Sequence, residues 1–262
     1  MFAIDVCAYA VMSNHYHLVV RLAPEKARAW GEAEVLGRWG QIFEIPPAVE
    51  RFGGSLPFRD GVCDWASLYR ERLSSLSWFM RCINEPLARL SNREDGCTGR
   101  FWEGRFKVQA LLDEKALLRC MTYVDLNPIR AKLAKTPETS MHTSLGARIK
   151  GGGESLLGFA DQSTAPVLPC SWQDYLELEE WTGCEWHEGK HGRIDPALPF
   201  IFERLSTHEE EWLEDLNRMN SWHGRALGSI EALQAYCEHL GQRWMRGLER
   251  HLNPNMPVAT QQ

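Results

Sequence analysis

Two histidines that lie two residues apart, His15 and His17, are the first candidates for chemistry in this chain. They follow the turn residues Ser13-Asn14 and precede the apolar run Leu18-Val19-Val20. Side chains alternate along a strand, so both imidazoles project from one face if a strand begins here. Neutral imidazole binds divalent metals, and two such ligands leave coordination positions open for water and a substrate. The alternative is a pair of inert, hydrogen-bonded histidines at the end of a strand.

A second candidate group lies toward the end of a predicted helix. Tyr123 and Asn127 are four residues apart, so they share one helical face, and Arg119 and Arg130 extend the same polar stripe. A tyrosine beside basic side chains is well placed to meet a phosphate group. The alternative is an ordinary amphipathic helix with an exposed hydroxyl group. Asp125 projects from a different face, so we expect it to be solvated and a poor general base.

Aromatic and basic side chains interleave in the segment Gly99–Lys107. Aromatic rings stack on unpaired bases, while Arg and Lys neutralise a phosphate backbone, so the pattern suits single-stranded DNA. The candidate contacts are Arg100, Phe101, Trp102, Arg105 and Lys107. The alternative is a strand that buries Phe101 and Phe106 and pairs Glu103 in a salt bridge.

The distribution of charge favours a phosphate-binding surface in the N-terminal part. The net charge of −6 argues against a nonspecific nucleic-acid binder. Residues 1–165, however, carry 21 Lys/Arg and 19 Asp/Glu, whereas residues 166–262 carry 8 and 16. Residues 100–135 alone hold 8 basic and 4 acidic side chains. The acidic C-terminal part is therefore interpreted as a different unit.

The composition is that of a folded, soluble protein. The 262 residues suffice for one large or two small domains, at 44% hydrophobic and 24% charged side chains. No apolar run of membrane-spanning length and no secretion signal is visible. The eight cysteines include no Cys-x-x-Cys pair, which favours reduced thiols in the cytoplasm over a disulfide framework.

Strands and helices must position these side chains. Residues 2–12 and 15–22 are predicted to form an antiparallel hairpin. One face of its second strand is expected to meet the core (Tyr16, Leu18, Val20, Leu22) and the other a site (His15, His17, Val19, Arg21). Residues 40–62 are expected to be loop. Helices are predicted from about 65 to 92, kinked at Pro86, and from Asp113, as N-cap, to about Leu126.

These elements indicate an α+β fold, an antiparallel sheet with helices packed on it, followed by a mostly helical extension. Residues 136–170 carry Pro- and Gly-rich linker signals. The predicted organisation is a catalytic domain at 1–148, a linker at 149–170 and an acidic helical extension at 171–262.

The order of the three segments resembles the single-tyrosine HUH transposases, in particular the REP-associated tyrosine transposases and related insertion-sequence enzymes. The resemblance spans roughly residues 3–145. Its specific parts are the Arg-Phe-Trp-Glu-Gly-Arg-Phe block at 100–106 and the Asn-Pro-Ile-Arg-Ala ending at 127–131, whereas a His-x-His pair alone is not specific.

The resemblance implies an HUH, ferredoxin-like fold and a role for each candidate. His15 and His17 would hold Mg²⁺ or Mn²⁺, with Asn127 as third ligand. Tyr123 would attack a scissile phosphate in single-stranded, hairpin-associated DNA, leaving a 5′-phosphotyrosine link and a free 3′-hydroxyl, and rejoining would reverse that step. The resemblance further implies a homodimer acting on the nucleoid in a bacterial cytoplasm.

The chain departs from the family's pattern at its start and in a long insertion at 36–62. Such domains begin with one more strand and a helix before the strand seen at residue 2, so the sheet is expected to lack one strand. This departure favours an alternative, a truncated or domesticated DNA-binding protein of the same fold without turnover. An unrelated metal-binding enzyme is a third reading, which would make the Tyr123 segment a coincidence.

Overall fold

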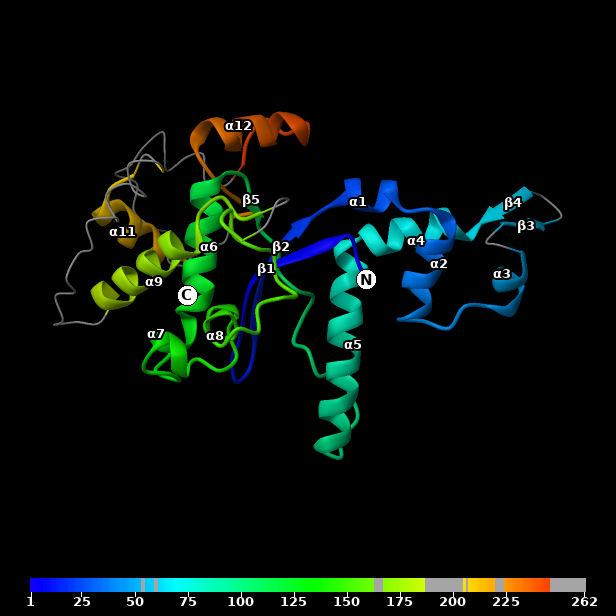
Figure 1. The fold of residues 1–262 in the computed structure, drawn as a ribbon, viewed down its shortest axis with the longest axis horizontal. Coiled ribbons are helices and arrows are strands. Elements are labelled where there is room, and N and C mark those ends of the chain that lie inside the picture. Colours follow the sequence, from blue (N-terminus) through cyan, green and yellow to red (C-terminus); the bar gives the residue numbers. More distant parts are fainter. Residues whose placement is uncertain are drawn as a thin grey trace. The chain divides into compact units, whose positions relative to one another are not determined.

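The computed structural model mixes helices with short strands (Figure 1). It describes residues 1–52, 55–58, 61–162, 167–186, 205, 207–219 and 224–245. Contacts divide the chain into two compact units. The first contains residues 1–6 and 20–106, and the second contains residues 7–19 and 107–262. Each unit has its own core, and the proposed catalytic side chains all belong to the second.

The hairpin predicted at the start of the chain is confirmed. Strands β1 (Ile4–Val11) and β2 (Tyr16–Leu22) form a two-stranded sheet, and the Met12 N–H closes the turn by donating to the His15 carbonyl at 2.9 Å. His15 therefore lies just before β2, and His17 is its second residue.

The prediction of which face of β2 meets the core is wrong. Val19, on the face of His17, is 2% exposed, whereas Leu22 on the opposite face is 50% exposed. Val19 shares a core with Leu118 and Met121 of helix α6 (Glu114–Asp125). The apolar run 18–20 offers a hydrophobic side chain to either face, so alternation alone does not decide which face a helix covers.

The remaining elements of the first unit are helices and one hairpin. They are α1 (Pro24–Ala29), α2 (Glu32–Gly40), α3 (Pro47–Phe52), β3 (Ser55–Phe58), β4 (Gly61–Asp64), α4 (Trp65–Ser74) and α5 (Leu76–Glu94). Strands β3 and β4 pair in antiparallel register, so the stretch expected to be loop holds a helix and a hairpin. The unit's core is aromatic, with Trp39 stacked on Tyr69 at a centroid distance of 4.4 Å.

The single helix predicted from 65 to 92 is two helices. Ser75 takes an extended backbone conformation with φ −88° and ψ 122°, which ends α4 and begins α5. The hydroxyl of the preceding Ser74 donates to the Arg70 carbonyl at 2.9 Å, a bond typical of a helix end. Pro86 lies inside α5. Apolar periodicity continues across the break, which is why the sequence did not reveal it.

The second unit is built around α6, whose predicted limits are confirmed. Asp113 caps its N-terminus by accepting from the Ala116 N–H at 2.8 Å, and Leu126 is its C-cap. The other elements are β5 (Ala110–Leu111), α7 (Asn127–Arg130), a 3₁₀ turn (Pro137–Thr139), α8 (Ser144–Ile149), α9 (Trp172–Trp186), α11 (Glu209–Met219), β6 (Ala226–Leu227) and α12 (Ile230–His239). Strands β5 and β6 pair in parallel.

Segments far apart in the sequence share the core of this second unit. Leu118 and Met121 of α6 pack in the same cluster as Phe159, Tyr175 and Trp212, all of them fully buried. Residues predicted as linker and as a helical extension thus supply part of the hydrophobic support of α6. None of the described helices is long and apolar enough to cross a membrane.

Candidate functional site

The two histidines lie at the end of the β1–β2 hairpin. The ring centroids of His15 and His17 are 4.9 Å apart, edge to face. His15 is exposed, and its Nδ1 lies 2.7 Å from Oδ1 of Asn14. His17 is half-buried because it faces the end of α6. The pair therefore spans the boundary between solvent and core.

Tyr123 and Asn127 meet His17 although more than 100 residues separate them from it in sequence. The rings of His17 and Tyr123 are edge to face at a centroid distance of 5.8 Å. The Asn127 amide nitrogen lies 3.4 Å from His17 Nε2. Asn127 directly follows the C-cap of α6 and begins α7, so the helical face predicted for Tyr123 and Asn127 continues across that junction.

Burial keeps the imidazole of His17 neutral. Desolvation, with the charge of His15 as a smaller cause, lowers the pKa of His17 to about 4. A second ring proton is therefore disfavoured at neutral pH, so one ring nitrogen carries N–H and the other keeps its lone pair. Neutral imidazole is the form that binds a metal.

The residues present fit a divalent ion that accepts imidazole. Two imidazoles and an amide oxygen would form an incomplete shell, which would suit Mn²⁺ at least as well as Mg²⁺ because Mg²⁺ prefers oxygen ligands. Asn127 would have to present its oxygen, and a rotation of its amide by 180° exchanges the oxygen with the nitrogen now facing His17. Among the residues that the structure describes, no three His, Cys, Asp or Glu side chains form a metal-binding group.

Arg130 joins the site as its position in the sequence suggested. Its guanidinium lies 5.3 Å from the centroid of the Tyr123 ring. Burial lowers the pKa of Arg130 from its ordinary value, yet a guanidinium stays protonated at neutral pH. A positive charge thus lies against the proposed nucleophile.

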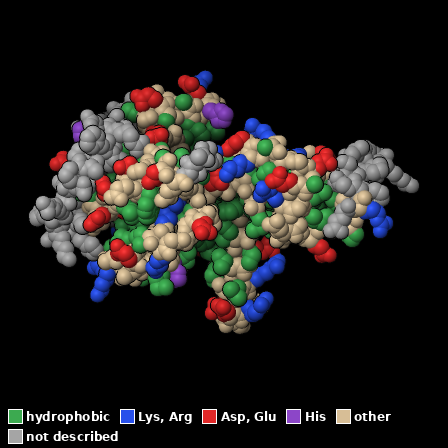
Figure 2. Space-filling model, viewed as in Figure 1, with side chains coloured by type: hydrophobic (Ala, Val, Ile, Leu, Met, Phe, Trp, Pro, Cys, Tyr) green, Lys and Arg blue, Asp and Glu red, His purple; other side chains and the backbone are tan. Residues whose placement is uncertain are grey.

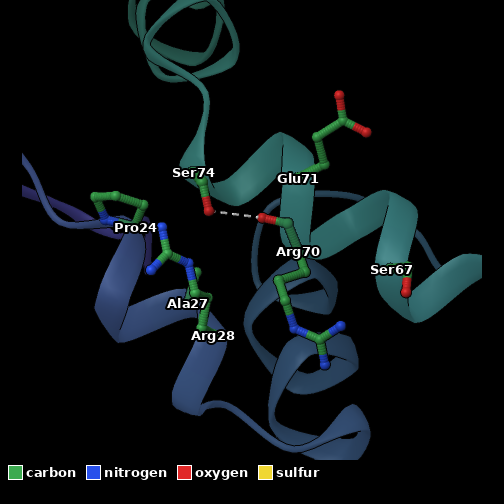
Figure 3. A pocket seen from close by; sticks show the side chains of 7 residues that line it. All are labelled: Pro24, Ala27, Arg28, Ser67, Arg70, Glu71 and Ser74. Atoms are coloured by element: carbon green, nitrogen blue, oxygen red, sulfur yellow. Dashed lines mark hydrogen bonds between the residues drawn. The ribbon is translucent and has the colours of Figure 1, made fainter.

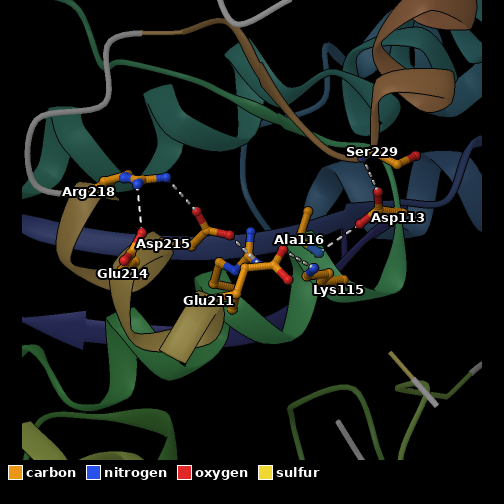
Figure 4. Close-up of polar contacts among 9 residues, drawn as sticks. Asp113, Lys115, Ala116, Glu211, Glu214, Asp215, Arg218 and Ser229 are labelled. Atoms are coloured by element: carbon orange, nitrogen blue, oxygen red, sulfur yellow. Dashed lines mark hydrogen bonds and ion pairs between the residues drawn. The ribbon is translucent and has the colours of Figure 1, made fainter. Parts of the chain in front are cut away.

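Arg119 does not contribute to this site. Its guanidinium pairs with Asp215 of α11 at 2.6 Å, lies over the Trp212 ring and is only 15% exposed. Nearby, Lys115 pairs with Glu211 at 2.7 Å (Figure 4). The acidic helix α11 therefore covers Arg119, the α6 side chain that was expected to meet DNA.

The aromatic-basic segment belongs to the first unit except for Lys107. It forms neither helix nor strand, so the alternative of a strand that buries Phe101 is wrong. Phe101 is 43% exposed and packs edge to face on Trp102, whose indole N–H donates to the Asn84 carbonyl at 3.0 Å. Arg100, Arg105 and Lys107 are exposed. The segment presents one partly exposed aromatic ring and three exposed cations.

Asp125 is buried, contrary to the expectation that it is solvated. It is 1% exposed and accepts hydrogen bonds from the Ser144 hydroxyl at 2.5 Å, the Leu145 N–H at 2.9 Å and the Tyr175 hydroxyl at 2.8 Å. Burial raises the pKa of Asp125 to about 6, against the effect of these donors. Its partners come from α8 and α9, whose contact with α6 no local pattern in the sequence indicates.

Two other parts of the surface present polar and charged side chains. The first unit has a pocket of about 290 Å³ between α1 and α4, which Arg28, Arg70 and Glu71 help to line (Figure 3). Arg70 already donates to the Trp30 carbonyl, and no catalytic set converges there. On the face in Figure 2, basic and acidic side chains are interspersed. The site of Tyr123 remains the best candidate.

A comparison with models of protein families, with curated proteins and with solved structures finds no match for this chain.

Proposed function

We propose that this protein is a metal-dependent DNA strand transferase, a transposase of the single-tyrosine HUH type, with Tyr123 as its nucleophile. One observation carries the proposal. The β2 side chain His17 contacts both Tyr123 and Asn127, so three residue types suited to phosphoryl transfer meet at one point. The mixture of helices with an antiparallel hairpin is compatible with an HUH, ferredoxin-like domain.

The proposed reaction exchanges one phosphate ester for another. The Tyr123 oxygen attacks a backbone phosphorus of single-stranded DNA, a new O–P bond forms, and the bond to the 3′ oxygen breaks. The phenol proton passes to solvent, and the departing 3′ oxygen takes up a proton to become a free hydroxyl. The 5′-phosphotyrosine preserves the ester for rejoining to another 3′ end.

Surrounding groups favour the attack of a phenol, whose ordinary pKa is near 10. Arg130, against the ring, stabilises negative charge on the phenolate and on the phosphate oxygens. A divalent ion bound by His15, His17 and Asn127 would polarise the phosphate. Exposed Arg100, Phe101, Arg105 and Lys107 would bind unpaired DNA next to a hairpin, with Trp102 supporting Phe101. The cellular partner we propose is hairpin DNA, bound by a homodimer on the bacterial nucleoid.

The proposal is tested by incubating the full chain with Mn²⁺ and hairpin oligonucleotides labelled at either end. We expect a band that survives denaturation and carries the 3′-side fragment. Tyr123→Phe should abolish it, whereas Tyr236→Phe, at a half-buried tyrosine of α12, should not.

The alternative of a DNA-binding protein without turnover predicts a different result. In that case the wild-type chain shifts the hairpin oligonucleotide in a native gel, yet forms no covalent band at any Mn²⁺ concentration. That outcome would refute the strand transferase and favour the binding protein.

A further inference from the structure

A buried hydroxyl group joins the helix of Tyr123 to the hairpin of His17. Ser144, the first residue of α8, donates its hydroxyl hydrogen to Oδ1 of Asp125 at 2.5 Å. The same hydroxyl oxygen accepts from the N–H of Tyr9, on β1, at 2.9 Å. Asp125 and Ser144 are 1% and 0% exposed. The connection thus runs from α6 through one side chain to β1, the strand that pairs with β2.

Two more contacts hold the same connection in place. Oδ1 of Asp125 also accepts from the Leu145 N–H at 2.9 Å, so it binds two consecutive residues at the start of α8. The segment before α8 lies along β1, since the Val11 N–H donates to the His142 carbonyl at 2.9 Å. The segment from His142 to Leu145 therefore contacts β1 through its backbone and α6 through Asp125.

Asp125 lies two residues after Tyr123 and two before Asn127, at the C-terminal end of α6. A shift of α6 by one residue would move its side chains by about 1.5 Å along the axis and by about 100° around it. Either change would break the contact between Asn127 and His17. Hydrogen bonds to a buried carboxylate are short and directional, so they resist such a shift.

We propose that Asp125 is a positioning residue. By binding Ser144 it sets the register of α6 against β1, and so holds Tyr123 and Asn127 against His17. Its effect on catalysis rests on the proposed function, whereas its effect on geometry does not.

The test compares two variants that each remove one hydrogen bond to Asp125. Ser144→Ala removes the bond that leads to β1. Tyr175→Phe removes the bond of 2.8 Å from α9, which does not lead to the hairpin. The readout is the nuclear Overhauser effect between ring protons of His17 and Tyr123, in the selectively labelled full chain without metal or DNA. We expect Ser144→Ala to weaken this effect, because only the backbone contacts of the segment from His142 to Leu145 then remain, and Tyr175→Phe to leave it unchanged.

A second pair of variants tests Asp125 itself. Asp125→Asn keeps an oxygen that accepts from Ser144 and Leu145, so it should retain the ring contact, whereas Asp125→Ala should lose it. Formation of the covalent adduct should fall at least tenfold in Ser144→Ala and less than threefold in Tyr175→Phe. If Asp125→Ala does not fold, the comparison of Ser144→Ala with Tyr175→Phe decides.

The positioning role is overturned if the ring contact is undiminished in Ser144→Ala, or if Tyr175→Phe weakens it equally. Because that contact is measured without DNA, its failure is distinct from failure of the proposed function. If the variants show the expected ring contacts but the wild-type chain forms no adduct, only the strand transferase is refuted.

Discussion

At the scale of single residues, the site depends on His17. Its imidazole is half-buried, neutral, and in contact with both Tyr123 and Asn127. His15 is exposed beside it, so the pair can present two nitrogen donors without burying a charge. The spacing of the histidines predicted their common face, and the Tyr-x-x-x-Asn spacing predicted the second pair. No pattern within either segment could predict that the two would meet, because their contact depends on tertiary packing.

The first prediction concerns metal affinity. His17→Ala or His15→Ala should weaken Mn²⁺ binding at least tenfold, because each removes one of two imidazole ligands. Isothermal titration of the full chain measures this. His239→Ala, at an exposed histidine of α12, is the matched control and should leave the affinity unchanged. Equal Mn²⁺ affinities in the wild type and the three variants would show that neither His15 nor His17 binds the metal.

The second prediction concerns Arg130. Arg130→Ala should slow covalent adduct formation about 10- to 100-fold, equivalent to about 1.4–2.7 kcal/mol of transition-state stabilisation, because it removes the charge beside Tyr123. Single-turnover rates at saturating Mn²⁺ measure the effect. Arg218→Ala on α11, where Arg218 pairs with Glu214, serves as the control for a lost surface arginine. A rate unchanged by Arg130→Ala would argue against its role.

At the scale of elements, helix α6 both carries Tyr123 and packs into the core of the second unit. Its limits followed from the Asp113 cap and the proline after Asn127, so they could be predicted. The partners of its polar face could not. Arg119 looks like a DNA contact in sequence, but α11 covers it more than 90 residues later in the chain. The burial of Asp125 could not be predicted either, because its partners Ser144 and Tyr175 come from helices later in the chain.

The third prediction distinguishes Arg119, which α11 covers, from Lys107, which is exposed to solvent. Arg119→Ala should lower the melting temperature because it removes the 2.6 Å ion pair with the half-buried Asp215, which then keeps Arg218 at 3.4 Å as its partner; it should hardly change the salt dependence of DNA binding. Lys107→Ala, at an exposed position, should do the reverse and reduce the slope of log K against log [salt] by about one. The opposite pattern would place Arg119, not Lys107, on the DNA.

At the scale of the whole molecule, the second unit extends across the predicted linker. Phe159, Tyr175 and Trp212 share a core with α6, so the linker region and the acidic C-terminal part both support the helix that carries Tyr123. The sequence does change from a slightly basic to an acidic composition after residue 165. Charge, however, does not show whether two segments share a core, since buried apolar residues decide this.

The fourth prediction concerns pH and Glu179, a buried side chain of α9. Burial, and secondly the negative charge of Asp125, raise the pKa of Glu179 well above its ordinary value. The folded state therefore retains a proton that the unfolded state releases. The resulting stability is present at low pH and is lost as the pH rises through the folded pKa.

Glu179→Gln should therefore flatten the pH dependence of the unfolding free energy. Urea unfolding at pH 5 and pH 8 measures it, and wild type should lose more stability between these values than the variant. An equal loss in both proteins would show that Glu179 ionises as freely in the folded protein as in the unfolded one.

The central claim, that Tyr123 is the nucleophile, is tested most directly by mass spectrometry of the protein after incubation with hairpin DNA and Mn²⁺. Nuclease and protease digestion should yield a peptide that carries a nucleotide through a phosphate ester on Tyr123. A nucleotide on any other residue, or none on a chain that demonstrably binds the DNA, would contradict the account.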